Sequence, residues 1–268
     1  MIFGRQSRRR GGVLMVNADD WGRDRETTNR TKDCLTRGTV NAVSAMVFMR
    51  DSERAADLAL ASSVDTGLHL NFTADFSLAG CPLQLREHHG RVARYLRSWP
   101  LARTVFHPGL RRAFDYVVSA QIDEFCRLYG DKPSRMDGHH HMHLCANVVF
   151  GNLLPKQTIV RRNFSFQAGE KNAINRYYRR GIDHLLGRHH IIGDFFFSLE
   201  PIDVHRRIPY ILSLAKDWYV EIETHPVNPD EYKFLMSPAT SELLKNIFSG
   251  DPDPELDLYQ VRRCHPQC

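Results

Sequence analysis

Short apolar segments that end in polar residues alternate with helix-like segments along much of the chain. A short apolar run that gives way abruptly to polar residues is typical of a buried parallel strand that ends at a loop. We therefore expect strands at 13–16, 43–49, 66–71, 134–144 and 218–223, and helices at 25–37, 52–61 and 111–129. Strand, loop and helix repeated in this order predict a mostly parallel sheet with helices outside it.

Two of the connecting segments carry further local signals. Gly38 follows the expected helix 25–37 at the position where a helix C-terminal cap is wanted. Residues 72–108 contain several glycines and prolines, and we expect a long irregular excursion there that covers or shapes a site. Helical spacing resumes afterwards, with six apolar positions suited to a core: Phe114, Val117, Val118, Ile122, Phe125 and Leu128.

Length and composition are those of an ordinary folded protein. The 268 residues are 42% hydrophobic and 25% charged, which argues against global disorder. Length alone leaves a single α/β barrel and two smaller domains both open. We favour one domain at 12–250, with the basic leader 1–11 and the tail 251–268 loosely ordered.

The net charge of +5 raises the question of a polyanionic partner. The basic residues form no single stripe: some lie in the leader, and others, Arg161, Arg162, Arg179 and Arg180, lie among acidic residues. We interpret them as solvated surface charge and expect no nucleic-acid partner. The leader has no apolar region and no segment approaches the ~18 apolar residues of a spanning helix, so we expect no transmembrane segment and a cytoplasmic location.

Chemistry-bearing side chains stand at the ends of the expected strands. Asp19 and Asp20 follow the first strand. Adjacent carboxylates repel one another unless a cation is near or their roles differ, so one could hold a metal while the other takes a proton. A cap or loop role for either aspartate is the alternative.

The densest motif is the sequence DGHHHMH at 137–143. In an extended backbone Asp137, His139, His141 and His143 would share one face. Imidazole is a common metal ligand and a nearby carboxylate often orients it, although histidines satisfied by the backbone are the alternative. Catalytic metal sites usually need three protein ligands, so other strand ends must contribute. His69, between Leu68 and Leu70, is a candidate, although a lone histidine is more often structural.

Taken together, the stretches VNADDWG (16–22), GLHLN (67–71), DGHHHMH (137–143) and His225-Pro226 resemble the four motifs of the YdjC-like carbohydrate deacetylases. The resemblance spans residues 13–226. The family includes chitooligosaccharide deacetylases and hopanoid-associated deacetylases. The resemblance implies a distorted TIM-like (β/α) barrel and one divalent metal ion, Mg²⁺ or Zn²⁺. It further implies that Asp20, His69 and His139 are the ligands.

The same resemblance assigns Asp19 as the base and His225 as the general acid. By strand alternation Glu221 and Glu223 would share a face with His225 and could orient it or raise its pKa. The sequence departs from the family pattern at Trp21, where phenylalanine is frequent, and at 71–73, which leaves the sugar open. Seven further residues are expected either to support the metal ligands and catalytic groups or to contact the substrate: Asp137, His141, His143, Asn71, Trp21, Glu221 and Glu223.

We therefore expect a metal-dependent hydrolase that removes an N-acetyl group from an amino sugar. Its partner would be an N-acetylated sugar, an oligosaccharide or a lipid-linked sugar, and a homodimer stays open. A metal-dependent phosphoesterase would also place Asp and His at barrel strand ends, but it usually needs more carboxylates and a second ion. A non-catalytic metal- or sugar-binding module would keep the histidines without needing Asp19 beside Asp20. Six scattered cysteines indicate neither a zinc ribbon nor a disulfide framework.

Overall fold

The computed structural model describes residues 12–166 and 173–248, so the leader 1–11 and the tail 251–268 lie outside it. The elements in chain order are β1 (Val13–Trp21), α1 (Arg25–Arg37), β2 (Ala42–Ala45), α2 (Ser52–Ser62), β3 (Asp65–Leu70), α3 (Leu83–Arg97), η1 (Ala102–Thr104), η2 (Pro108–Leu110), α4 (Arg111–Tyr129), β4 (Arg135–Gly138), η3 (His139–Leu144), α5 (Ala146–Gly151), β5 (Ile159–Val160), α6 (Ala173–Leu186), β6 (Phe195–Ser198), α7 (Arg207–Leu214), β7 (Tyr219–Thr224), α8 (Pro229–Leu235) and α9 (Pro238–Phe248).

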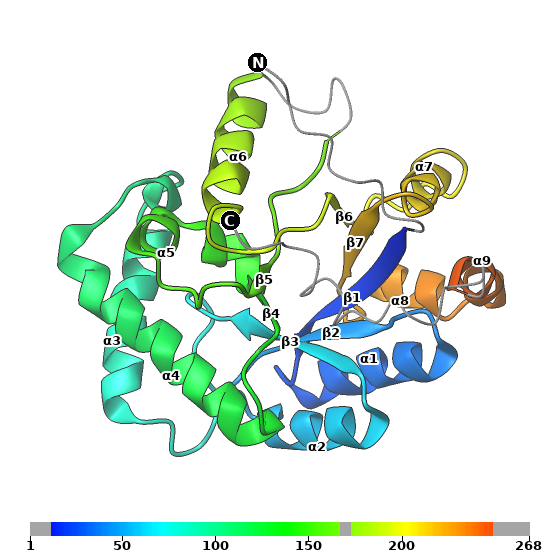
Figure 1. The fold of residues 1–268 in the computed structure, drawn as a ribbon. Coiled ribbons are helices and arrows are strands. Elements are labelled where there is room, and N and C mark those ends of the chain that lie inside the picture. Colours follow the sequence, from blue (N-terminus) through cyan, green and yellow to red (C-terminus); the bar gives the residue numbers. More distant parts are fainter. Residues whose placement is uncertain (1–11, 167–172, 249–268) are drawn as a thin grey trace.

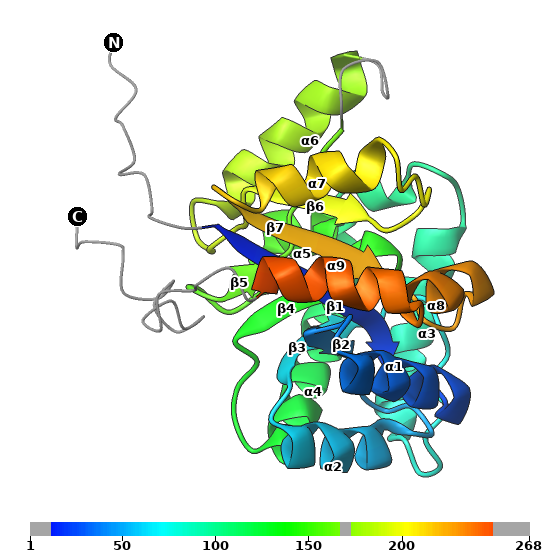
Figure 2. The ribbon, with the colours of Figure 1, turned by 90° about the vertical axis from the view of Figure 1, so that its right-hand side faces the viewer.

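One curled sheet organises the described residues. Its seven strands follow the order β5-β4-β3-β2-β1-β7-β6, and every neighbouring pair is parallel. Figures 1 and 2 show the helices arranged around the outside of this curl. This confirms the α/β, distorted TIM-like barrel. Because all strands run the same way, their carboxyl ends meet at one edge, where such folds carry their sites.

Helices α1 and α4 have the bounds that the sequence predicts. Helix α1 begins after Asp24, whose side chain accepts a hydrogen bond from the Thr27 amide, and ends at Gly38 in the left-handed conformation at φ +76°. A side chain is unfavourable in that conformation, which explains the glycine. Of the apolar positions proposed for α4, four are buried and two are partly buried against the core.

The expectation of an irregular excursion at 72–108 is wrong for its middle part. Residues 83–97 form α3, which packs against α4 and buries Leu85, Val92 and Leu96. Two local signals misled the sequence reading. Pro82 stands at the N-cap, where its missing amide hydrogen costs nothing, and Gly90 lies inside the helix at a cost of about 1 kcal/mol. The burial of an apolar face outweighs that cost.

The expected strand at 134–144 is also too long. Strand β4 stops at Gly138, and the chain turns into η3, with His140 and His141 at φ +54° and +57°. Gly138 is required by this turn, because a Cβ there would lie 3.0 Å from the His143 amide nitrogen. The alternation that would place four side chains of this motif on one face therefore ends at His139. Likewise the strand expected at 43–49 ends at Ala45.

Two smaller observations concern the described part of the chain. None of its helices combines the length and apolar character needed to cross a bilayer. Cys34, Cys81, Cys126 and Cys145 are free thiols, in line with the absence of a disulfide framework from the sequence pattern.

Candidate metal centre and active site

Strand β1 delivers two neighbouring carboxylates to the same edge of the sheet. Successive residues of a regular strand point to opposite faces. The register of β1 against β2 shifts between Ala18 and Trp21, and Asp20 has φ +64°. A bulge of this kind re-aims a side chain. It explains how Asp19 and Asp20 both reach one site.

Asp20, His69 and His139 converge from β1, β3 and the start of η3. Their ligand atoms all lie within 4.8 Å of one another. Asp20 Oδ1 lies 2.9 Å from His139 Nδ1 and 3.3 Å from His69 Nε2. The side chains of Asp20 and His69 are almost completely buried. The structure therefore brings together the three side chains that the sequence motifs single out as ligands.

The free atoms of this triad fit a metal ion. Among the described residues, the buried Asp20 Oδ1 and His69 Nε2 make no well-aligned hydrogen bond, although they lie 3.3 Å apart. Buried polar atoms are normally satisfied, so two unsatisfied atoms aimed at one point indicate a missing partner. Two imidazole nitrogens with one carboxylate oxygen form a donor set that zinc and related ions use, whereas Mg²⁺ prefers oxygen ligands. The chemistry of the residues fits a divalent cation.

Supporting contacts orient the ligands. His69 Nδ1 lies 2.6 Å from Asp137 Oδ1, which leaves Nε2 directed at Asp20. The second oxygen of Asp137 accepts a hydrogen bond of 2.6 Å from Ser44 Oγ. A carboxylate on the far nitrogen of a ligating histidine fixes its tautomer and ring orientation. Arg23 Nη1 holds the other oxygen of Asp20 at 2.6 Å.

The ionisation of the triad follows from these neighbours. Burial alone would raise the pKa of Asp20, but the imidazoles of His139 and His69 hold it well below its ordinary value. Burial alone would lower the pKa of His69, yet the carboxylates of Asp19 and Asp137 raise it well above its ordinary value. The neighbouring carboxylates therefore surround His69 with negative charge, as ligands surround a cation.

A buried arginine after β5 binds the surrounding carboxylates. Arg161 holds both oxygens of Asp19 at 2.7 Å. It also lies 2.8 Å from Asp137, 2.7 Å from Glu221 and 3.3 Å from Glu223. We call these five residues the Arg161 cluster. The interpretation of Arg161 as solvated surface charge is wrong, since it is 2% exposed. Its planar fork matches carboxylate geometry, which explains arginine here rather than lysine.

The third group of the site lies at the end of β7. Ligand atoms of Asp19, Glu223 and His225 lie within 4.8 Å of one another. The backbone amide of His225 donates to Glu231 Oε2 at 2.8 Å, which fixes the chain just beyond the strand. Burial and the charge of Asp19 raise the pKa of Glu223 well above its ordinary value. Glu221 accepts a hydrogen bond from Arg161 rather than joining the group around His225.

The other histidines of the cluster diverge after Gly138. His140 Nδ1 lies 3.1 Å from Thr73 Oγ1, and His141 Nε2 lies 3.5 Å from Glu223. The buried His143 Nε2 contacts the Arg161 carbonyl oxygen at 3.0 Å. Burial lowers the pKa of His143 to about 4, so it is neutral at pH 7. The left-handed turn thus gives each histidine a different partner.

Two of the residues expected to support the site or contact the substrate, Trp21 and Asn71, are enclosed by the core. Trp21 is 1% exposed, and its indole donates to the Ala55 carbonyl oxygen at 3.0 Å. Asn71 is fully buried, and its side-chain oxygen accepts from the amides of Thr73 and Ala74. Both side chains shape the loops beside the site and are enclosed by protein.

Sequence reasoning missed Arg161, Ser44 and Arg23. Arg161 directly follows the two-residue strand β5, which is too short to recognise from the apolar pattern. Ser44 lies inside β2 among apolar residues, and a polar residue in a buried strand is the signal that could have identified it. Arg23 directly follows the sequence DDWG (19–22), and a cation so close to two aspartates is the signal that could have identified it.

The fold and the site define an α/β barrel-like protein with a candidate metal centre and titratable groups at the carboxyl ends of its strands. The sequence profile described as YdjC-like protein matches residues 13–246. The chain belongs to the family of YdjC-like proteins.

Curated relatives agree with this assignment. The chain is 30% identical over 151 residues to the carbohydrate deacetylase of Danio rerio, covering 53% of this chain and 46% of that protein. It is 30% identical over 136 residues to the chitooligosaccharide deacetylase of Proteus mirabilis (strain HI4320), covering 49% and 50%. The matched region spans about half the length of these relatives.

A similar fold is found in a crystal structure of an Enterococcus faecalis V583 protein whose proposed role is cellobiose-phosphate cleavage. It superposes with a TM-score of 0.59 at 18% identity, covering 88% of this chain and 95% of that one. At this identity the likeness concerns the fold. It supports the curled parallel barrel described above.

Proposed function

We propose that this protein is a metal-dependent carbohydrate N-deacetylase that hydrolyses the acetamido group of an amino sugar. The proposal rests above all on the convergence of Asp20, His69 and His139 beside the carboxylate of Asp19. Two buried atoms of this group, Asp20 Oδ1 and His69 Nε2, make no well-aligned hydrogen bond. The names of the curated relatives support the substrate class.

Asp20, His69 and His139 would hold one divalent cation. When bound, that ion would polarise the amide carbonyl and lower the pKa of the attacking water. Asp137 and Ser44 keep His69 directed at the ion, and Arg23 occupies the second oxygen of Asp20. Asp20 would then offer one oxygen to the metal.

Asp19 would take the proton from the attacking water. Arg161 contacts both of its oxygens, and Asn17 donates to Oδ1 at 2.7 Å, so the carboxylate is fixed in one orientation. Only an ionised carboxylate can accept this proton, and the guanidinium of Arg161 lies directly against it. Oδ2 keeps a lone pair beyond the one that Arg161 uses, whereas Oδ1 accepts from both Arg161 and Asn17.

His225 would donate the proton that the departing amine needs. Its ring lies within reach of Asp19 and Glu223, and Glu231 holds its backbone. The proposed base and acid would then lie next to each other, because β1 and β7, which carry them, are hydrogen-bonded neighbours.

Acetate release tests this function directly. The protein is freed of metal with a chelator, reloaded with Zn²⁺, Mg²⁺, Mn²⁺ or Co²⁺, and offered N-acetylated mono- and oligosaccharides together with phosphate esters. Release of acetate with at least one ion and one sugar, and none without a metal, is expected. Phosphate release instead would identify a phosphoesterase, and metal binding without either product would identify a binding module.

A further inference from the structure

The exposed apolar side chains of the protein are unevenly distributed. More than half of the large ones in the described ranges lie at 99–106, at Phe150 and at 174–178, that is, around η1, at the end of α5 and at the start of α6. Helix α5 contacts both η1 and α6, so the three segments form one region of the surface. In Figures 1 and 2, α6 projects at one end of the molecule, far from α2. A gathering of exposed apolar side chains marks an interaction surface.

Helix α6 carries apolar residues on two faces. Its inner face buries Ile182 and Leu186 in the core. Ile174, Tyr177 and Tyr178 follow the i, i+3, i+4 spacing of a single helix face and are 81%, 71% and 44% exposed. A surface helix normally presents charged and polar residues on the face that points away from the core. The outer face of α6 is therefore unusually apolar.

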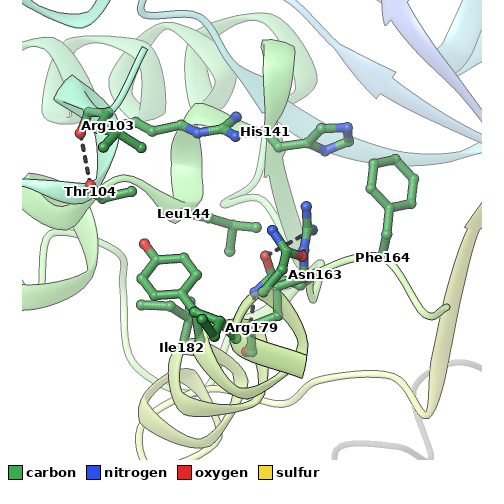
Figure 3. A pocket seen from close by; sticks show the side chains of 12 residues that line it. Arg103, Thr104, His141, Leu144, Asn163, Phe164, Arg179 and Ile182 are labelled. Atoms are coloured by element: carbon green, nitrogen blue, oxygen red, sulfur yellow. Dashed lines mark hydrogen bonds between the residues drawn. The ribbon is translucent and has the colours of Figure 1, made fainter. Parts of the chain in front are cut away.

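This face continues across a hollow to η1. Leu101 lines the same cavity of about 540 Å³ as Ile174 and Tyr178 of α6. Figure 3 shows Arg103 of η1 on one side of this cavity and Arg179 of α6 on the other. The two segments thus border one another on the surface. We define the η1–α6 patch by six residues: Leu101, Arg103, Ile174, Tyr177, Tyr178 and Arg180.

The charge of this region has a single sign. The sequence segments 98–110, 145–157 and 173–182 contain no aspartate or glutamate. Their basic residues are Arg103, Lys156, Arg176, Arg179 and Arg180. Asp183, the single acidic residue in the sequence of α6, is buried and pairs with Arg162 at 2.9 Å. The patch therefore combines exposed apolar side chains with positive charge.

Charge complementarity distinguishes the possible occupants of the patch. A second copy bound about a twofold axis would bring the same arginines against one another, which is unfavourable. Nucleic acid matches the charge but offers no apolar partner to the aliphatic Leu101 and Ile174. An anionic lipid surface matches both properties, because its headgroups are negative and its acyl boundary accepts apolar side chains. Tyrosine is enriched at that boundary, where its ring is in apolar and its hydroxyl in polar surroundings.

We propose that the η1–α6 patch docks the protein on the surface of an anionic lipid bilayer. Leu101, Ile174 and the two tyrosines enter the boundary between headgroups and acyl chains, while Arg103 and Arg180 contact the lipid phosphates. No helix in the described ranges is long and apolar enough to cross a bilayer, so the attachment is peripheral. This inference concerns where the protein binds and does not depend on the proposed hydrolysis.

Vesicle binding by the full chain, free of metal and sugar, tests the docking surface apart from catalysis. Flotation assays compare phosphatidylcholine vesicles with vesicles in which one third of the lipid is phosphatidylglycerol. Binding to the anionic vesicles is expected to be roughly tenfold or more stronger than to the neutral ones, because each arginine near the surface contributes about fivefold. Added salt should reduce the difference, since it screens the headgroup charge.

Two matched pairs of variants locate the contact. Arg180→Gln should weaken binding to anionic vesicles about fivefold, whereas Arg25→Gln, at an exposed arginine of α1, should not. Leu101→Ser should weaken it roughly tenfold through the loss of apolar burial. Its control is Leu60→Ser on α2, because the two leucines are 59% and 55% exposed. All four side chains are exposed, so these substitutions leave the core intact.

Two tryptophans report which surface meets the lipid. The carbonyl oxygen of Trp99 accepts a hydrogen bond from the Ala102 amide in η1, whereas Trp218 directly precedes β7 at the amino ends of the strands. Both are similarly exposed, and Trp21 is buried. Brominated phosphatidylglycerol quenches a tryptophan that enters the bilayer boundary. We expect quenching in Trp218→Phe, which keeps Trp99, and little quenching in Trp99→Phe.

The outcomes separate this proposal from the deacetylase function. A preference for anionic vesicles that is weakened in Arg180→Gln and Leu101→Ser and reported by Trp99 supports the docking surface, whether or not acetate is released. Absent binding, equal binding to neutral and anionic vesicles, equal effects of a variant and its control, or stronger quenching of Trp218 overturns it. Self-association that Leu101→Ser abolishes would instead identify a second copy as the occupant. Binding of single-stranded DNA that Arg180→Gln weakens, without vesicle binding, would identify nucleic acid.

Discussion

Replacing Arg161 with methionine tests the role of the positive charge at the centre of the Arg161 cluster. Methionine keeps much of the side-chain length and apolar stem but removes the guanidinium, which has four carboxylate neighbours. Asp19, Asp137, Glu221 and Glu223 would then share a buried region without that charge. Removing one partner of a buried ion pair typically costs about 3–5 kcal/mol, because an uncompensated charge is left behind.

The expected loss depends on pH in a definite direction. Burial raises the pKa of Glu221 and Glu223 even though the charge of Arg161 lowers it, so removing the guanidinium raises the pKa of both groups further and also takes away a charge that holds the pKa of Asp137 below its ordinary value. The folded variant then binds more protons than the unfolded chain. Its stability is therefore greatest at low pH and falls as the pH rises through the raised folded-state pKa values.

Chemical denaturation of metal-free wild type and variant at pH 5.5 and pH 8 measures this difference. We expect Arg161→Met to lose about 3–5 kcal/mol at pH 8 and clearly less at pH 5.5. The control is Arg127→Met, whose side chain is 55% exposed beside Glu124 and Glu53. Its exposed pairs contribute about 0.2–1 kcal/mol at either pH. Equal losses for the two variants, or a pH-independent loss in Arg161→Met, would refute the assignment of a charge-balancing role.

Four further predictions concern the chemistry. His139→Ala should lose most of its bound metal in elemental analysis; full stoichiometric metal would remove it from the ligand set. Asp19→Asn should keep the metal while kcat falls by ~10²-fold or more, the scale of general-base catalysis, and near-normal kcat in the loaded variant would exclude it as the base. His225→Ala should be partly rescued by substrates with better leaving groups, whereas equal impairment on all substrates would indicate a structural role. Metal affinity should rise with pH near neutrality, because the carboxylates of Asp19 and Asp137 outweigh burial and raise the pKa of His69, and a protonated imidazole cannot bind metal; an affinity independent of pH would contradict its role as a ligand.

Local signals predicted the elements whose ends are set locally. The bounds of α1 follow from Asp24 before it and Gly38 after it, and both caps are visible in the sequence. The motif residues Asp20, His69 and His139 converge as the strand-end argument requires, because neighbouring parallel strands end at one edge. The ligand assignment itself stays a prediction.

The remaining features depend on contacts between distant segments. Helix α3 is stabilised by packing on α4, and that gain is invisible in a window containing Pro82 and Gly90. The left-handed His140 and His141 depend on the close approach of Gly138 to His143. Sequence reasoning cannot see such tertiary contacts, so it extended the strand.

Arg161 shows the same limit for electrostatics. Arginine is mostly exposed in proteins. The four carboxylates that reverse this tendency lie 24 to 142 residues away from Arg161 along the chain. Asp19, for example, is separated from it by 142 residues. The charge pattern near Arg161 therefore carried no information about its burial.

The strand order has a consequence for synthesis of the chain. The three proposed metal ligands lie within residues 20–139, whereas Glu223 and His225 lie at the end of β7, which pairs directly with β1. A nascent chain released as far as β5 would contain every proposed ligand and lack the proposed acid, His225. That acid therefore joins the site only through a late, long-range pairing of β7 with β1, and such pairings close slowly.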